Sequence, residues 1–254
     1  MARRSRMQSQ ADTAPQSTPF PYKDYGQART EMRKALTGPS FYALLTGASG
    51  MGKTSLLREL TAEVDRHSYQ VLYISSSNAS MLSIVRFVAQ KLRVVPKRSY
   101  LETVDLIVGA IQALNSHLLL WVDEADLVAP ATLQEVRILT EATPNVTQLF
   151  SIVLSGLPPL TSMLEDPALF PLKRRIGLRC TLSGLRRNEL EPFLVHRFGV
   201  REAKRVPEQV LDDLFERTQA TPALLDKVVR SVLNNAKDPI DPEECRAALD
   251  AQGL

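Results

Sequence analysis

"LLTGASGMGKTSLLREL", residues 44–60, joins a short apolar run to a glycine-rich turn and then to a Lys-Thr pair that opens a helix-patterned stretch. Gly47, Gly50 and Gly52 accept backbone torsions that a Cβ atom would forbid, so consecutive N–H groups can turn inward on an anion. The dipole of a helix that begins at Lys53 adds positive potential at the same place. The stretch therefore predicts a phosphate-binding loop between a strand and a helix.

The spacing of this loop is that of a Walker A motif, Gly-x4-Gly-Lys-Thr. In that motif the backbone surrounds the α- and β-phosphates of ATP, the lysine reaches the β- and γ-phosphates, and the threonine hydroxyl binds Mg²⁺. An ordinary glycine-rich turn is the alternative, but a buried strand at 41–47 and a helix at 53–67 favour the motif. The predicted nucleotide-binding residues are Gly47, Ala48, Ser49, Gly50, Met51, Gly52, Lys53, Thr54, Ser55 and Asp123.

Outward from the loop, strand patterns alternate with helix patterns. Residues 69–77 and 148–160 predict strands, as does the apolar run that begins at His117. Helices are expected at 80–94, 100–115 and 131–143. From about residue 184 the strand signal ends and four short helical patterns follow. We therefore expect an α/β fold in which helices sandwich a P-loop NTPase parallel sheet, followed by a small all-α lid domain.

Length and composition set the domain expectations. The chain has 254 residues, 44% of them apolar, and no window long enough to span a membrane. We expect a disordered basic tail at 1–19, a nucleotide-binding domain at 20–183 and a helical lid at 184–254. The N-terminus lacks the apolar core of a signal peptide, which favours a cytoplasmic location without membrane contact. Cys180 and Cys245 are expected to be reduced structural thiols.

Two acids follow the third apolar strand pattern, in "LLLWVDEAD". The carboxyl end of a strand in an open parallel sheet is where ligands bind. Asp123 can hold Mg²⁺ through its water shell while Thr54 binds the metal directly. Glu124 is then available to orient the attacking water, and Ser155 could hydrogen-bond that water or a phosphate. Capping of the next turn, and an ordinary polar strand end at Ser155, are the structural alternatives.

Basic residues suggest two further roles. Hydrolysis needs another positive charge near the γ-phosphate, in cis or from a neighbouring subunit, and Arg174 and Arg175 are the candidates. No acidic residue lies between Asp166 and Glu189, so residues 173–187 are either solvated surface or a nucleic-acid contact.

The layout resembles the AAA+ ATPases, within the group that includes ExeA-type secretion ATPases, TniB- and TnsC-type transposition proteins and the Mu-type B protein. The pieces that carry the resemblance are "PFPYKDYGQAR", the loop stretch, "LLLWVDEAD", "IVLSGLPPL" and "KRRIGLRCTLSGL". The resemblance implies that Asp123 and Glu124 form Walker B, that Ser155 lies near sensor 1 and that Arg175 is a trans-acting arginine finger. It also suggests Asn78 as the residue that restrains Glu124.

One position departs from the resemblance. Similar proteins often carry Gly-x-Pro-Arg in the lid, where the arginine contacts ATP as sensor 2. This chain has "QATPALLDKVV", which puts Ala223 at the place of that arginine. Either Lys227 or Arg217 replaces it, or closure of the lid depends less on the γ-phosphate. Slow hydrolysis is the expected consequence.

Three functions remain open. The first is an ATPase that forms an ATP-dependent homo-oligomer, a ring or helical filament, on double-stranded DNA through backbone contacts and directs or activates a transposase. The second is a secretion or signalling ATPase that acts on a protein assembly. The third is a nucleotide-gated binding switch with little turnover. The sequence does not identify the DNA-binding residues.

Overall fold

The computed structural model describes residues 18–38, 40–65, 67–75, 80–141, 149–235 and 240–253. The chain divides into two compact units. The first contains residues 27–48 and 56–182 and is called here the sheet unit. The second contains the described residues up to Gly26, the loop Ser49–Ser55 and the chain from Ser183 onward, and is called the helical unit. Most of the predicted 1–19 tail lies outside the described residues.

The sheet unit is built on five parallel strands in the order β2-β3-β4-β1-β5. They are β1 (Tyr42–Gly47), β2 (Tyr69–Ser75), β3 (His117–Asp123), β4 (Phe150–Gly156) and β5 (Ile176–Leu182). Strands β1 and β4 are buried at every position, as expected of strands covered on both faces. The predicted α/β parallel sheet is confirmed.

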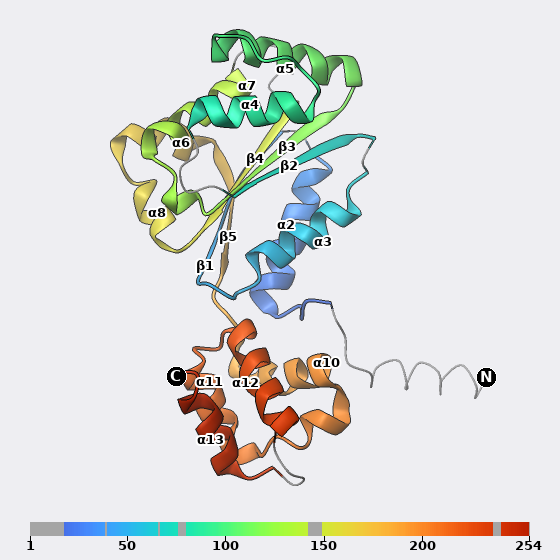
Figure 1. Cartoon of the computed structure of the whole chain (residues 1–254), viewed down its shortest axis with the longest axis vertical. Helices are drawn as coiled ribbons and strands as arrows, with labels where there is room; N and C mark the ends of the chain where they lie inside the picture. The colour runs from blue at the N-terminus through green and yellow to red at the C-terminus, as the bar shows by residue number, and fades with distance from the viewer. Residues whose placement is uncertain are drawn as a thin grey trace, which may run out of the picture. The chain divides into compact units, whose positions relative to one another are not determined.

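Helices cover both faces of this sheet (Figure 1). On one face lie α4 (Met81–Lys91), α5 (Tyr100–Leu114), α6 (Pro130–Val136), α7 (Ile138–Glu141), α8 (Pro159–Met163) and α9 (Phe170–Arg175). The other face carries α2 (Lys23–Leu36) and α3 (Lys53–Glu63). The helix expected at 131–143 is divided at Arg137 into α6 and α7.

The alternation of side chains decides which residues reach each face. Leu72 and Ile74 of β2 belong to the main hydrophobic core, which also includes the buried faces of α4 and α5. Because successive residues of a strand point to opposite faces, Tyr73 and Ser75 project from the other face. That face also carries Asp123, the last residue of β3, which the register places directly beside Ser75.

β5 is a strand that the sequence reasoning missed. The sequence predicts only a basic segment at 173–187, yet Ile176, Cys180 and Leu182 are buried, whereas Gly177 and Arg179 are exposed. This alternation is the period of a strand at the edge of a sheet. β5 pairs with β1 and forms one edge of the sheet.

In the described residues from Ser183 onward, the helical unit contains four α-helices. They are α10 (Leu190–Ala203), α11 (Leu211–Arg217), α12 (Pro222–Asn235) and α13 (Pro242–Asp250). Each corresponds to one of the four helical patterns of the sequence, so the all-α character of this region is confirmed. In the described parts of the chain, no helix has the length and apolar character needed to cross a bilayer.

Both cysteines are free and buried, one in each unit. Burial raises the pKa of Cys180 to about 12, and the charge of Glu31 acts in the same direction. Burial likewise raises the pKa of Cys245 to about 11. The reactive thiolate forms are therefore disfavoured at neutral pH, in keeping with structural thiols.

Candidate functional site

The glycine loop leaves the carboxyl end of β1 and enters α3 at Lys53. Gly50 and Gly52 have φ angles of 81° and 99°, a region that side-chain-bearing residues rarely occupy. Ala48, Ser49 and Gly50 are exposed, and the first turn of α3 carries no acidic residue to compensate the helix dipole. The loop therefore has the backbone geometry and potential of a phosphate cradle.

Gly47 is required for a different reason than the sequence suggested. It is the last residue of β1 and is absent from the residues with positive φ. A Cβ atom at this position would lie 2.8 Å from the carbonyl oxygen of Leu182 in β5. Its lack of a side chain thus permits close pairing of β1 with β5, and the predicted torsional role belongs to Gly50 and Gly52.

The remaining predicted loop residues lie in the first turn of α3. Thr54 is exposed, whereas Lys53 and Ser55 are half-buried. The donor set fits Mg²⁺, because a threonine hydroxyl and an aspartate carboxylate are the hard oxygen ligands that this ion prefers. Bound there, Mg²⁺ would neutralise phosphate charge. The assignment of Thr54 and Asp123 to the metal stays a prediction.

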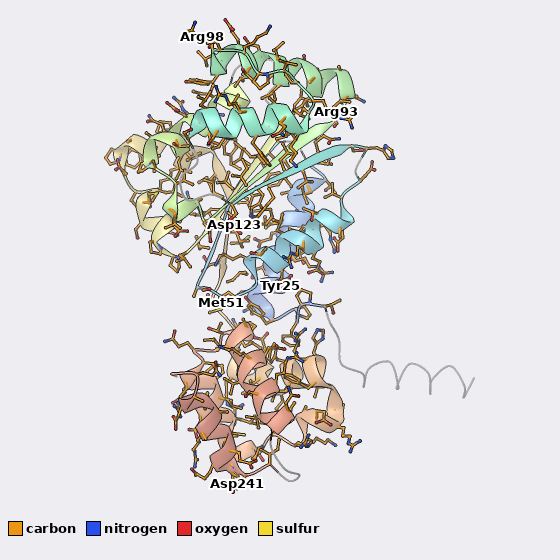
Figure 2. The ribbon with its side chains drawn as sticks, viewed as in Figure 1. Tyr25, Met51, Arg93, Arg98, Asp123 and Asp241 are labelled. Atoms are coloured by element: carbon orange, nitrogen blue, oxygen red, sulfur yellow. The ribbon has the colours of Figure 1, made fainter. Side chains whose placement is uncertain are left out.

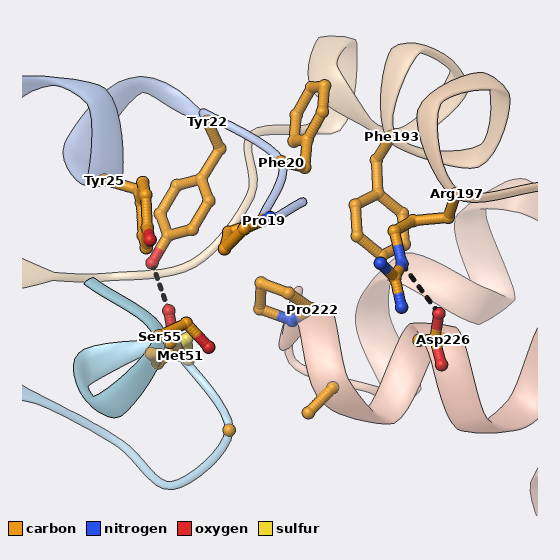
Figure 3. Close-up of a pocket in the computed structure, with 13 residues that line it drawn as sticks. Pro19, Phe20, Tyr22, Tyr25, Met51, Ser55, Phe193, Arg197, Pro222 and Asp226 are labelled. Atoms are coloured by element: carbon orange, nitrogen blue, oxygen red, sulfur yellow. Dashed lines mark hydrogen bonds and ion pairs between the residues drawn. The ribbon is translucent and has the colours of Figure 1, made fainter. Parts of the chain in front are cut away.

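A pocket of about 330 Å³ opens within the helical unit beside the loop. Three segments line it: the N-terminal stretch Pro19–Tyr25, the loop residues Gly50–Ser55, and the lid helices α10 and α12 (Figure 3). Phe20 and Phe193 supply aromatic rings, which pack edge to face with centroids 5.7 Å apart. A pocket with aromatic walls and a few polar side chains beside a phosphate loop fits a nucleotide base.

Tyr22 connects the N-terminal stretch to the glycine loop through a hydrogen bond. Its hydroxyl donates a hydrogen bond of 2.7 Å to the carbonyl oxygen of Met51 (Figure 3). Burial raises the pKa of Tyr22 above its usual value, and the charges of Asp24 and Glu189 act in the same direction. Tyr22 and Tyr25 are both almost completely buried, so they shape the pocket wall and hold the loop.

Among the described residues that line this pocket, the one cation is Arg197. Arg197 of α10 lines it and donates to Asp226 Oδ1 of α12 at 2.8 Å. Arg217, one of the two candidates for the absent sensor 2 arginine, forms an ion pair with Asp250 of α13 instead. Lys227, the other candidate, is exposed on α12. The sequence did not indicate Arg197, because it lies 26 residues before Ala223. Only the packing of α10 beside α12 brings it to the pocket.

The acidic site occupies the carboxyl end of β3 in the sheet unit (Figure 2). Asp123 is buried, and both of its carboxylate oxygens accept hydrogen bonds. Oδ1 accepts from the Ser155 hydroxyl at 2.6 Å and from the Glu124 backbone N–H at 3.0 Å, while Oδ2 accepts from the Tyr73 hydroxyl at 2.7 Å. Asp123, Glu124 and Ser155 are thus brought together, as their strand positions predicted.

Ser155 is fully buried, and its hydroxyl also accepts a hydrogen bond of 2.6 Å from the Trp121 indole N–H. Its hydroxyl proton is directed at Asp123 in this structure. Contact of Ser155 with water or phosphate stays a prediction.

Glu124 differs from Asp123 in its surroundings. It is exposed and has a φ of 53°, which is rare for a residue with a side chain. The hydroxyl of Ser75, at the end of β2, donates to its Oε2 at 3.3 Å. Asn78, the residue suggested for this restraint, lies outside the described residues. The sequence analysis did not identify Ser75, because only the register of β2 with β3 places it beside Asp123.

The two candidate finger arginines, Arg174 and Arg175, are exposed at the C-terminal end of α9. Lys173, directly before them, forms an ion pair with Glu165. The role of Arg174 and Arg175 in a neighbouring subunit's site stays a prediction.

A five-stranded parallel sheet flanked by helices, with a glycine loop after β1 and acids after β3, defines a protein of the P-loop NTPase class. Residues 41–164 match the model of a family described as an AAA domain. This match covers just under half of the chain and is a likeness to that family.

General secretion pathway protein A of Aeromonas hydrophila is 27% identical over 181 residues, which are 69% of this chain and 33% of that protein. The chain thus spans about a third of the length of this curated relative. Among solved structures, the ORC2 protein of Aeropyrum pernix in its ADP form has a TM-score of 0.69 at 16% identity and covers 93% of this chain and 70% of its own. The ORC1 protein of Aeropyrum pernix in complex with DNA has a TM-score of 0.58 at 18% identity, with 89% and 65% coverage. These two likenesses concern the fold.

Proposed function

We propose that this chain is an AAA+ ATPase that assembles with ATP on double-stranded DNA and regulates transposition by selecting target sites or recruiting or activating a transposase. The nucleotide part rests on the glycine loop, the acids of β3 and the pocket of the helical unit. The transposition part rests on the resemblance of the motifs to TniB- and TnsC-type proteins. The DNA part is carried by one surface of the sheet unit.

That surface is a strip of five cations on α4 and on the segment that joins it to α5, called here the basic strip. It consists of Arg86, Lys91, Arg93, Lys97 and Arg98, all exposed. No acidic residue occurs between Asp65 and Glu102. Figure 2 places Arg93 and Arg98 at opposite ends of the layer formed by α4 and α5. The strip therefore extends along the layer, as a phosphate backbone would require.

The cations of the basic strip differ from many other surface arginines in whether they form ion pairs with acidic side chains. Across the described residues, many arginines are neutralised by acids, such as Arg33 by Glu63 and Arg246 by Asp213. None of the five strip cations forms an ion pair with an acidic side chain in those same residues. In the 173–187 segment, by contrast, Lys173 is paired with Glu165. Unpaired exposed cations that attract phosphates give binding that tolerates any base sequence.

ATP would couple to DNA through assembly of subunits. If Arg174 or Arg175 completes the nucleotide site of a neighbouring subunit, binding of ATP favours the oligomer, and an oligomer repeats the basic strip along the duplex. The Asp226 contact of Arg197 and the absence of a sensor 2 arginine at Ala223 support slow hydrolysis.

The double variant Arg93→Ala/Arg98→Ala tests the DNA surface. We expect binding to unrelated duplexes, measured with ATP present by gel shift or fluorescence anisotropy, to weaken about tenfold or more. The slope of log affinity against log salt concentration should fall by about 2, because each lost phosphate contact removes about 0.9. Arg230→Ala/Arg246→Ala is the matched control, because it removes the same charge from paired arginines. Equal binding by both double variants would contradict the proposal.

A secretion ATPase that acts on a protein assembly is the second candidate, and the relative in Aeromonas hydrophila favours it. The DNA-binding assay described above distinguishes the two functions. A secretion ATPase gives no ATP-dependent retention of duplex DNA at any salt concentration, whereas a transposition ATPase gives stronger retention with ATP than with ADP.

A further inference from the structure

The side chain of Tyr73 belongs to a chain of hydrogen bonds around Asp123 that the motifs do not account for. The Tyr73 hydroxyl lies 2.7 Å from Asp123 Oδ2, and the Ser155 hydroxyl lies 2.6 Å from Oδ1. Trp121 donates to Ser155 in turn, at 2.6 Å. The carboxylate is thus held from both sides by hydroxyl donors, one from each neighbouring strand.

The positions of these donors follow from the sheet. β2 is an edge strand, and its register with β3 sets Tyr73 opposite Trp121 and Ser75 opposite Asp123. The Tyr73 side chain therefore reaches two residues forward along the sheet to the acid. It remains 39% exposed, so the apolar core does not require it at this position. Its hydroxyl is the feature that the site uses.

An aspartate carboxylate rotates readily about its last torsion, because that torsion is broad and roughly two-fold. Hydrogen bonds to both oxygens restrict the rotation. Partners that hydrogen-bond a metal-binding carboxylate commonly change metal affinity by about tenfold or more when they are removed. A hydrogen-bond donor to Oδ2 is thus expected to fix the orientation of the carboxylate relative to the water shell of a bound metal.

We propose that Tyr73 is a positioning residue that orients Asp123 toward the hydrated Mg²⁺ of a bound nucleotide. This inference rests on the proposed nucleotide function and adds a residue to it. Tyr73 acts through Asp123 and contacts neither nucleotide nor metal. Tyr73 therefore sets the Mg²⁺ concentration that tight nucleotide binding requires. It has less effect on the nucleotide affinity without metal.

The chain offers its own optical reporter for this effect. Trp121 is the single tryptophan of the sequence, and its indole N–H is linked to Asp123 through the Ser155 hydroxyl. Rearrangement around Asp123 changes the environment of this indole. Its emission therefore follows Mg²⁺ binding independently of hydrolysis.

The test compares Tyr73→Phe with wild type in titrations of Mg²⁺ at a fixed concentration of a non-hydrolysable ATP analogue, followed by calorimetry and by Trp121 emission. Tyr69→Phe is the matched control, because the Tyr69 hydroxyl of the same strand donates to the Leu36 carbonyl oxygen, outside the acidic site. Thermal melting and binding in excess EDTA verify that both variants are folded and keep the loop intact.

We expect Tyr73→Phe to raise the Mg²⁺ concentration for half-saturation about three- to tenfold, with binding in EDTA unchanged and Tyr69→Phe equal to wild type. An unchanged or lowered Mg²⁺ requirement in Tyr73→Phe would overturn the inference while leaving the nucleotide function in place. Absence of nucleotide binding by wild type would remove the proposed function itself, so the two failures are distinct.

Discussion

Glu124 and Asp123 are adjacent in sequence yet lie in opposite environments, which fits the proposed roles of Glu124 as base and Asp123 as metal carboxylate. Asp123 is buried and hydrogen-bonded through both oxygens, whereas Glu124 is exposed and, among the described residues, its carboxylate accepts one weak hydrogen bond of 3.3 Å from the Ser75 hydroxyl. The motif predicted both residues. It could not predict Tyr73 and Ser75, because they lie about 50 residues earlier and meet the acids only through the register of β2 with β3.

Ser75→Ala tests the restraint on Glu124. Loss of the hydroxyl frees the carboxylate to orient water, so hydrolysis without DNA should rise about two- to fivefold, the small effect expected of a weak hydrogen bond to an exposed group. ATP affinity should stay unchanged. The measurement is the steady-state rate with and without duplex DNA, with Glu124→Gln as the comparison that should bind ATP and lose turnover. A slower basal rate in Ser75→Ala would show that the hydroxyl supports Glu124.

At the scale of elements, hydrophobic periodicity predicted α4 and α5 because each has a clear apolar face, and helix-start residues predicted the four C-terminal helices. It missed β5, although Ile176, Cys180 and Leu182 alternate with exposed residues, because the neighbouring arginines favoured a surface interpretation. The close approach of β5 to Gly47 could not be predicted either, since it depends on strand order.

Gly47→Ala tests that approach. The added methyl group would lie 2.8 Å from the Leu182 carbonyl oxygen, so we expect the free energy of unfolding to fall by about 1–3 kcal/mol. Gly109→Ala is the matched control, because Gly109 lies in α5 with open space around it and should gain about 0.5–1 kcal/mol from helix propensity. Urea unfolding of both variants measures the difference. Equal stability of the two variants would show that β1 and β5 separate without cost.

At the scale of the whole molecule, loop, acids and candidate finger belong to one proposed cycle of ATP binding, assembly and hydrolysis. The motif residues could be predicted from sequence because backbone chemistry fixes their spacing. The basic strip could not be recognised as distinctive until the pairing of the other arginines was known, because its composition alone resembles an ordinary solvated surface.

Arg175→Ala tests whether the nucleotide site is shared between subunits. ATP binding should be retained, and hydrolysis in the assembled, DNA-bound state should fall by about a hundredfold or more, because a finger arginine stabilises transition-state charge. Lys173→Ala, which removes a paired neighbouring cation, should hydrolyse at nearly the wild-type rate. Normal turnover by assembled Arg175→Ala would exclude this residue as the finger.

Every step of the proposed cycle requires that the glycine loop and Lys53 bind a nucleoside triphosphate together with Mg²⁺. Isothermal titration calorimetry of a non-hydrolysable ATP analogue tests it most directly, with wild type and Lys53→Ala compared in Mg²⁺. We predict saturable one-to-one binding by wild type and loss of that binding in a folded Lys53→Ala variant. Wild-type protein that shows no affinity for the analogue in the presence of Mg²⁺ would contradict the account.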